Sequence, residues 1–409
     1  MKPRLFSLFF VMLIPLPLYA QTATFTLMQL LDRAFLESPL LSASRRDELA
    51  AGAGITTARA YPNPEFEIGG GQASSRVAGG VSGFAPMLGI AQVIESPSLR
   101  AARLRSAQDR LQIAEAQTGA TRTFLAAEIK RRYYEVVRLQ EEQKALNEDL
   151  LLTEQIRERV RVRVRSGEAA RFDQVRADNE VAIVRKNLDG TTLRIGQALS
   201  QLRQAVSPSL PPQFEISVAT PEGKELLQQD YQRLRDLLLQ NNPEIAVAKR
   251  ELQRAEQQIA VERALVLPQF TLRATQDRDP SVTINRIGAQ VQIPLLNRRE
   301  GPIAEAQAQA QRYRDLLGQR ELDADAGFEA AWQSYRAALT QLSALEGGII
   351  ERARAVVDIA EAAYRFGERG ILEFLDAQRQ FRLSRNELLQ ARHATRIARL
   401  EIERLAGQP

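Results

Sequence analysis

The strongest constraint on this fold is an internal duplication. Residues 164–173 resemble residues 364–373, and in each segment a glycine (Gly167, Gly367) precedes a glutamate and is followed six positions later by a carboxylate. Two further pairs of similar segments occur in the same order along the chain: 37–39 resembles 241–243, and 88–92 resembles 287–291. A period of this length is too long for a solenoid of short repeats, so the sequence predicts two halves of a duplicated domain.

An export signal and a proline cluster divide the chain further. Residues 1–20 combine a charged start, a short apolar run and a small residue at Ala20, which is the pattern of a cleaved signal peptide. Prolines gather within residues 206–223. We therefore expect a first repeat over 21–205, a Pro-rich linker over 206–223 and a second repeat over 224–409.

Long helices dominate both repeats. Apolar residues recur at heptad spacing in two seams, a pattern typical of helices that pack side by side as coiled coils. The seams comprise Phe328, Trp332, Tyr335, Leu339 and Leu342, and then Ile349, Ala353, Val356, Ala360 and Ala363. No proline interrupts 303–367, a stretch that spans ~100 Å as a helix, and Gly347 and Gly348 are placed to soften or break it. A matching stretch in the first repeat covers 98–166.

Each repeat also contains one predicted β-hairpin, at about 63–95 and about 266–294. In the second hairpin Phe270, Leu272 and Ala274 alternate with polar residues, and the same period of two continues after a turn. Such alternation fits either a half-buried soluble sheet or a lipid-facing barrel with a wet lumen. Isolated hairpins between very long helices favour the barrel. One chain supplies four strands, whereas a closed barrel needs about eight or more, so several copies must share it, and three would supply twelve.

The composition limits the chemistry of the chain. It has no cysteine, one histidine and a formal net charge of +5, which falls by two when the signal peptide is removed. We therefore expect no disulfide, no thiolate metal site and no lipid anchor on an N-terminal cysteine. No run of about 18 apolar residues follows residue 20. Interspersed acids and bases do not indicate nucleic-acid binding.

No catalytic constellation stands out, so we predict that the chain is not an enzyme and takes no cofactor or metal. His393 lies in a charged helical stretch, where we expect an exposed side chain, and no triad can be assembled around it. Residues 69–71 are three glycines that we expect at a strand end, and they do not form a dinucleotide fingerprint.

Several motifs together resemble the TolC family of outer-membrane factors. They are the segment 364–381 with its run 375–379, the phrase 63–67 and the segment 89–100. The likeness covers essentially the whole chain after the signal peptide. It implies a mainly α protein with membrane β-strands. Its duplicated helix–β-hairpin–helix–helix units would form a trimeric 12-stranded β-barrel that continues into a long periplasmic α-helical barrel.

The resemblance also implies a function. TolC-like proteins are the exit ducts of tripartite efflux systems in the outer membrane of Gram-negative bacteria. There a homotrimer, embedded in outer-membrane lipid, docks onto a periplasmic adaptor (membrane fusion) protein and an inner-membrane RND-type pump. The segments 63–67 and 89–100 resemble the branch that serves heavy-metal cation pumps of the cobalt–zinc–cadmium type. Alternative functions are drug efflux, type I protein secretion and, from another class, a periplasmic coiled-coil adaptor without a pore.

By the same resemblance, the two glycine turns form the periplasmic tip. Adaptor contacts fall on Gly167, Glu168, Gly367 and Glu368, and the residues that close the tip fall on Asp173, Tyr364, Arg369, Glu373 and Asp376. Three copies of each carboxylate near one axis would repel one another and favour bound cations. An Arg–Asp pair between neighbouring helices would offset this repulsion. The residues also allow a simpler interpretation, in which both glycines are helix C′ residues and Asp173 and Glu373 are first-turn acids.

Overall fold

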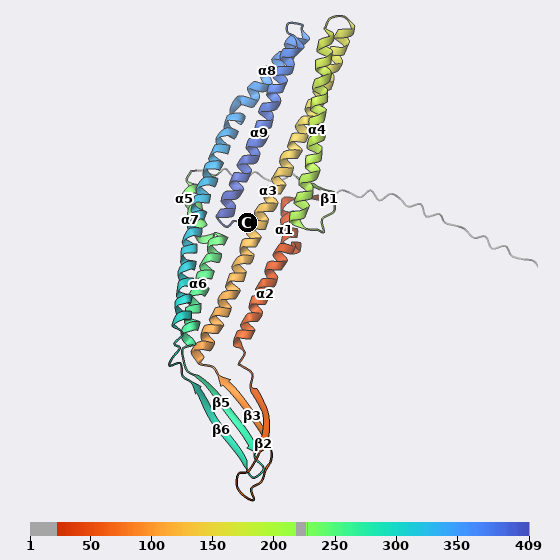
Figure 1. The fold of residues 1–409 in the computed structure, drawn as a ribbon. Coiled ribbons are helices and arrows are strands. Elements are labelled where there is room, and N and C mark those ends of the chain that lie inside the picture. The colour runs from red at the N-terminus through yellow and green to blue at the C-terminus, as the bar shows by residue number, and fades with distance from the viewer. Residues whose placement is uncertain (1–22, 218–225, 227, 409) are drawn as a thin grey trace, which may run out of the picture.

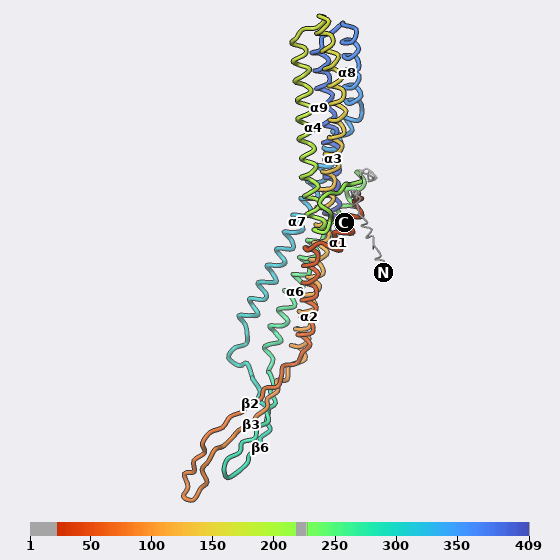
Figure 2. The backbone as a smooth tube through the Cα atoms, turned by 90° about the vertical axis from the view of Figure 1, so that its right-hand side faces the viewer, coloured from red at the N-terminus to blue at the C-terminus, as the bar shows by residue number. Residues whose placement is uncertain are grey.

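The computed structural model describes residues 23–217, 226 and 228–408. The molecule is elongated, with a β-sheet at one end, two helical hairpin tips at the other and a small mixed region between them (Figures 1 and 2). The predicted signal peptide at 1–20 and the last part of the predicted linker, 218–223, lie outside the described residues.

The order of elements repeats along the chain. Each half contributes two shorter helices, a β-hairpin and a pair of long helical segments. The first half consists of β1 (Ala23–Phe25), α1 (Leu27–Glu37), α2 (Pro39–Arg59), β2 (Glu65–Ala73), β3 (Gly83–Ile94), α3 (Pro97–Arg165), α4 (Arg171–Val206) and β4 (Phe214–Ile216). The second consists of α5 (Asp230–Asn241), α6 (Pro243–Ala264), β5 (Gln269–Arg278), β6 (Thr283–Gln292), α7 (Glu300–Ala344), a π-helical segment (Leu345–Ile349), α8 (Ile350–Arg365) and α9 (Ile371–Leu405). The duplicated helix–hairpin plan is thus confirmed.

Local sequence explains how the shorter helices meet. Pro39 and Pro243 each occupy the first position of a helix, where the missing N–H costs no hydrogen bond. Asn242 caps α6 by accepting hydrogen bonds from two backbone N–H groups in its first turn. Residues 37–39 and 241–243 therefore resemble each other because each segment forms the corner between two consecutive helices.

The two hairpins join into one antiparallel sheet of four strands. Its order is β2-β3-β5-β6, so the β3–β5 pair joins the two halves, and β2 and β6 are the edges. The register places Phe66, Ile90, Ala274 and Ile287 in one row across the sheet. The glycines at 69–71, which we expected at a strand end, lie inside β2. They fit there because strand β3 continues past them and pairs with all three.

The helices continue the sheet in the same order. Next to the strands, α2 packs on α3, α3 on α6 and α6 on α7. Toward the other end, α4 packs on α3, α3 on α9, and both α7 and α8 on α9 (Figure 1). Helix α3 alone has 69 residues and spans about 100 Å. The helical part is therefore a single layer whose outer helices each keep one side without a packing partner among the described elements.

Buried side chains form separate cores along this layer. In the middle of the molecule Phe328, Trp332 and Tyr335 pack with α5 and the end of α9. This burial confirms the first predicted seam and the structural role expected for its aromatic residues. No helix in the described ranges is long and apolar enough to cross a membrane.

The second predicted seam is partly wrong. Ile349 and Val356 are exposed, and Val357 and Tyr364 are buried instead. The cause is a kink at the glycine pair, where Gly347 and Gly348 leave helical φ and ψ and shift the phase of the helix that follows. Gly348 adopts a φ of 128° there, so the break expected at the glycine pair is present. The first half has no such break in α3.

The expectation that His393 is exposed is also wrong. The side chain is half-buried, and its Nε2 lies 3.5 Å from a carboxylate oxygen of Glu135 on α3. Burial lowers its pKa, and the charge of Glu135 only partly counteracts this. Because α9 packs against α3, the helix face that carries His393 is turned inward. Charged neighbours in the sequence do not reveal which face of a helix meets another helix.

Candidate functional site

Two glycine turns form the end of the molecule opposite the sheet (Figure 1). Gly167 and Gly367 have left-handed φ values of 78° and 79°. The N–H of Glu168 donates to a carbonyl five positions earlier at 2.8 Å, and the N–H of Glu368 does the same at 2.9 Å. This is the Schellman pattern of a helix C-terminus. The helix-cap interpretation of both glycines is therefore confirmed, and both glutamates are exposed at the tip.

The helices that leave these turns each begin with an acid in the first turn. Asp173 occupies this place in α4 and Glu373 in α9. Their N-cap residues, Ala170 and Gly370, make no side-chain cap hydrogen bond. A carboxylate in the first turn therefore complements N–H groups that lack a helical partner and the positive end of the helix dipole. Asp173 is half-buried, whereas Glu373 is exposed.

Tyr364 links the two tips. Its buried ring stacks on Phe374 of α9 with the centroids 6.2 Å apart, and the guanidinium of Arg163 of α3 lies 5.2 Å from its centroid. Burial raises the pKa of Tyr364, Arg163 counteracts this, and the charge of Asp173 raises the pKa further. The structure thus brings Tyr364 and Asp173 together from different halves. Sequence analysis missed Arg163 because its contact with Tyr364 crosses between the halves.

The other predicted gate residues lie at the exposed start of α9. Arg369 Nη1 is 3.1 Å from a carboxylate oxygen of Glu373, and Asp376 Oδ1 is 3.8 Å from Nη1 of Arg379. More than half of each of these side chains is exposed. Within the described part of one chain, Arg369 therefore pairs with an acid one turn away. It does not pair with Asp173 on a neighbouring helix.

Buried ion pairs join the two halves between the tip and the middle. Asp149 of α3 accepts a hydrogen bond from Arg385 of α9 at 2.5 Å, and Glu180 of α4 accepts one from Arg382 of α9. Only 10% and 5% of the two acidic side chains are exposed. Burial raises the pKa of Asp149, and the two arginines counteract it. Sequence analysis missed these pairs because the partners lie more than 200 positions apart.

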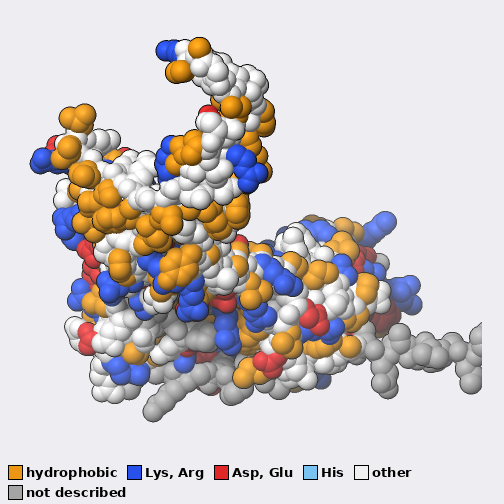
Figure 3. Space-filling view, turned by 90° about the horizontal axis from the view of Figure 1, so that it is seen from below, with side chains coloured by type: hydrophobic (Ala, Val, Ile, Leu, Met, Phe, Trp, Pro, Cys, Tyr) orange, Lys and Arg blue, Asp and Glu red, His pale blue; other side chains and the backbone are white. Residues whose placement is uncertain are grey.

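The sheet has two chemically different faces, and no other described element covers either of them. Side chains that pair across antiparallel strands share a face, and successive rows alternate between the faces. One row contains Phe66, Ile90, Ala274 and Ile287, and the next contains Glu67, Gly89, Thr275 and Arg286. Phe66 is 75% exposed and Ile287 is 91% exposed. Viewed from the sheet end, hydrophobic side chains gather over the strands (Figure 3).

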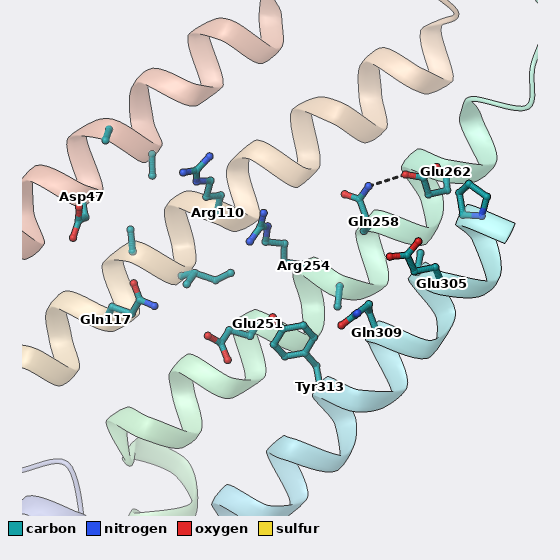
Figure 4. A pocket seen from close by; sticks show the side chains of 17 residues that line it. Asp47, Arg110, Gln117, Glu251, Arg254, Gln258, Glu262, Glu305, Gln309 and Tyr313 are labelled. Atoms are coloured by element: carbon teal, nitrogen blue, oxygen red, sulfur yellow. Dashed lines mark hydrogen bonds between the residues drawn. The ribbon is translucent and has the colours of Figure 1, made fainter. Parts of the chain in front are cut away.

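The four helices beside the sheet line an open hollow of about 680 Å³. Residues of α2, α3, α6 and α7 all line it (Figure 4). Because these helices form one layer, a hollow shared by all four lies on a concave side of that layer. Ten charged or polar residues line it and are labelled in Figure 4; Asp47, Arg110, Arg254 and Glu305 are among them. This side of the layer therefore suits water and hydrated solutes.

Comparison with known proteins identifies the class to which this architecture belongs. The outer membrane efflux protein family matches residues 30–207 and 234–408, one segment in each half of the chain. The protein belongs to this family of outer-membrane efflux channels. Such channels are passive, so the prediction that the chain is not an enzyme is confirmed.

Individual relatives align with nearly the whole chain. The cobalt-zinc-cadmium resistance protein CzcC of Cupriavidus metallidurans is 23% identical over 378 residues, which cover 90% of this chain and 86% of CzcC. The pyoverdine export outer membrane protein OpmQ of Pseudomonas aeruginosa is 24% identical over 402 residues, which cover 91% and 82%. The crystal structure of CusC matches with a TM-score of 0.78 at 18% identity and covers 98% of this chain and 99% of that one. The resemblance to TolC-like channels is therefore confirmed.

Proposed function

We propose that the protein is the outer-membrane exit duct of a tripartite efflux system. The observation that carries the proposal is a sheet with one apolar and one polar face, joined strand by strand to a helical layer with a polar concave side. An apolar sheet face is stable against lipid, whereas polar surfaces line a water-filled path. Because strands and helices follow one another in the same order, the path would pass unbroken from sheet to helices.

Three copies would complete the duct. Strands β2 and β6 end the sheet with unpaired edges, which lipid does not tolerate. Four strands cannot close by themselves, and three chains would form a twelve-stranded barrel. The outer helices offer matching surfaces at the tip end. Val356 and Ile359 of α8 are exposed, as are Phe172 and Val175 of α4.

The tip would serve as the gate and as the docking site. In a trimer, Glu373 and Asp376 would form acidic rings near the axis, and Arg369 would reach an acid of the neighbouring chain such as Asp173. The exposed turns at Gly167 and Gly367 would contact a periplasmic adaptor, which in turn would connect the duct to an inner-membrane pump. Support for this assignment comes from the exposed charges of both turns and from the Tyr364–Asp173 proximity.

Planar bilayers test both the duct and its gate. The purified full chain should form long-lived ion-conducting channels, and a protein that never conducts would contradict the duct. Asp173→Ala with Arg369→Ser should raise single-channel conductance. The control pair, Asp178→Ala with Arg365→Ser, removes the same charges from exposed positions and should leave the conductance unchanged. Wild-type conductance in both variants would reject the gate and leave the duct intact.

Heavy-metal cations are the cargo that we propose, on the likeness to CzcC. The similar likeness to OpmQ makes an exported organic metabolite the second candidate. Susceptibility of a deletion strain to zinc, cobalt, cadmium, copper, silver and several dyes separates the two. Selective metal sensitivity that the intact gene reverses would support the first cargo. Sensitivity to organic compounds alone would support the second.

A further inference from the structure

Each of the four connections between the sheet and the helices carries an arginine that has no acidic partner among the described residues. Arg59 ends α2, Arg100 lies in the first turn of α3, Arg263 lies in the last turn of α6, and Arg298 precedes α7 by two residues. One such cation therefore stands at every junction of a strand with a helix. Most arginines elsewhere in the helical layer do have a carboxylate within reach.

Two of the acids at this level already bind other arginines. Glu95 binds Arg103 through both carboxylate oxygens, at 2.6 and 2.8 Å. Glu262 binds Arg299 at 2.5 Å. Glu65 starts β2 and Glu300 lies in the first turn of α7, where it complements the helix dipole; neither pairs with one of the four arginines in the described residues. The four arginines thus lack a counter-ion within the described chain, so their counter-ions have to come from outside.

Exposed apolar side chains lie at the same level of the molecule as these arginines. Tyr61 is 64% exposed, Leu295 is 70% exposed and Leu296 is fully exposed, all in the short connections themselves. The apolar face of the sheet also reaches this level, with Ile94 and Phe270 paired at the ends of their strands. The junction is therefore the boundary between an apolar surface and a polar one. Amphipathic and cationic side chains gather at such a boundary in proteins that sit in membranes.

Arg100 shows how one of these cations is held. Its guanidinium lies 4.2 Å from the centroid of the Tyr61 ring, and its Nη2 donates to the backbone carbonyl of Arg59 at 3.0 Å. Its Nε is buried and has no hydrogen-bond partner. The ring and the carbonyl fix the plane of the guanidinium without neutralising its charge. A planar donor group fixed in this way suits the oxygens of a phosphate.

We propose that this junction binds the head groups of anionic phospholipids. The phosphates would contact Arg59, Arg100, Arg263 and Arg298, and the acyl chains would lie against the apolar sheet face and Leu296. The inference rests on the proposed membrane position of the sheet. It adds a chemical preference, because each arginine near an anionic lipid surface strengthens association about fivefold, and an uncharged head group offers no such gain.

Lipid retention by the full chain tests this site. The protein is reconstituted into vesicles of three parts phosphatidylcholine to one part phosphatidylglycerol and then extracted, and the co-purified lipids are quantified by mass spectrometry. We expect the ratio of phosphatidylglycerol to phosphatidylcholine to rise about fivefold, from 1:3 in the vesicle to about 5:3 in the co-purified lipid. Replacing all four arginines by glutamine should abolish that enrichment, and Arg263→Gln alone should lower it if the fourfold variant does not fold.

The matched control replaces Arg46, Arg157, Arg336 and Arg354 by glutamine, which removes the same charge from the helical layer. It should retain the wild-type enrichment. No enrichment in the wild type, or equal enrichment in junction variant and control, would overturn the site. Binding of inorganic phosphate that the junction variant loses, with no phosphatidylglycerol enrichment in the wild type, would show a free-anion site and overturn the lipid assignment. Flotation of the vesicles reports insertion separately, so a protein that never enters the bilayer contradicts the proposed function itself.

Discussion

Gly167 and Gly367 end α3 and α8 with φ near +80°, a backbone conformation that costs a residue with a side chain about 1–2 kcal/mol. No other atom lies near the place where a Cβ would be added, so this strain is the whole effect. We expect Gly167→Ala to lower the free energy of unfolding by about 1 kcal/mol, measured by denaturant titration. Gly119→Ala, in the open interior of α3, should instead raise it by about 0.5 kcal/mol. The same sign for both variants would contradict the argument.

Glu37 ties α1 to the start of the linker. Its carboxylate accepts hydrogen bonds from Ser207 at 2.6 Å, from Ser209 and from Arg33. These bonds, with that of Ser207 the largest, lower the pKa of Glu37 from 4.5 to about 2. Because the pKa is lower in the folded state, the stabilisation is complete above about pH 4.5 and is lost as the pH falls toward 2.

This linkage predicts how a Glu37→Gln variant should behave. The wild type should melt at a higher temperature than the variant at pH 7, and the two melting temperatures should converge as the pH approaches 2. Calorimetry or circular dichroism across that range measures the difference. A gap that stays constant with pH would show that the carboxylate charge is not its cause.

Packing between helices determines which ion pairs contribute most to the free energy of unfolding. Arg385→Ala would leave Asp149 buried between α3 and α9 without its hydrogen-bonded ion-pair partner, which costs about 3 kcal/mol. Removing the charge of Asp149 as well, with Asp149→Asn, should recover a large part of that loss. Arg314→Ala breaks an exposed pair with Glu256 and should cost about 0.5 kcal/mol. Equal losses of unfolding free energy for Arg385→Ala and Arg314→Ala in denaturant titrations would contradict the special importance of the buried ion pair between the halves.

The π-helical segment shows a limit of pattern analysis at the level of whole helices. Its glycine pair predicts a break, and the second heptad seam, which starts at Ile349, assigns Ile349 and Val356 to the core. The kink at the glycine pair shifts the helical phase, which moves them outward and brings Val357 inward. A repeat read from sequence assumes a constant helical phase, and a kink removes that assumption.

At the scale of the whole molecule, the outer helices of a single chain carry exposed apolar side chains that other copies can cover. Val356 and Ile359 of α8 are 54% and 69% exposed in a single chain. Replacing both by lysine should therefore leave one chain folded, since neither side chain contributes to a core. We expect the double variant to run as a monomer in size-exclusion chromatography with light scattering, where the wild type runs as a trimer.

The control for this experiment is Asp358→Lys, which changes the charge of α8 on another face of the helix. It should stay trimeric, and its helical circular dichroism should match that of the double variant. A double variant that remains trimeric would show that α8 does not lie between copies. Loss of helicity in the double variant would show that these residues support the single chain after all.

The long helices, the hairpins and the glycine caps follow from residues a few positions apart, and the duplication follows from comparing such local patterns along the chain. Period-two alternation, heptad spacing and a glycine with positive φ are local properties, so residues such as Phe270, Trp332 and Gly367 show them in the sequence alone. The pairing of Asp149 with Arg385, the burial of His393 and the contact of Arg163 with Tyr364 depend on which helix faces meet. That choice is made by packing between segments far apart in the chain, because the free energy of a charge depends on the burial and partners that packing gives it.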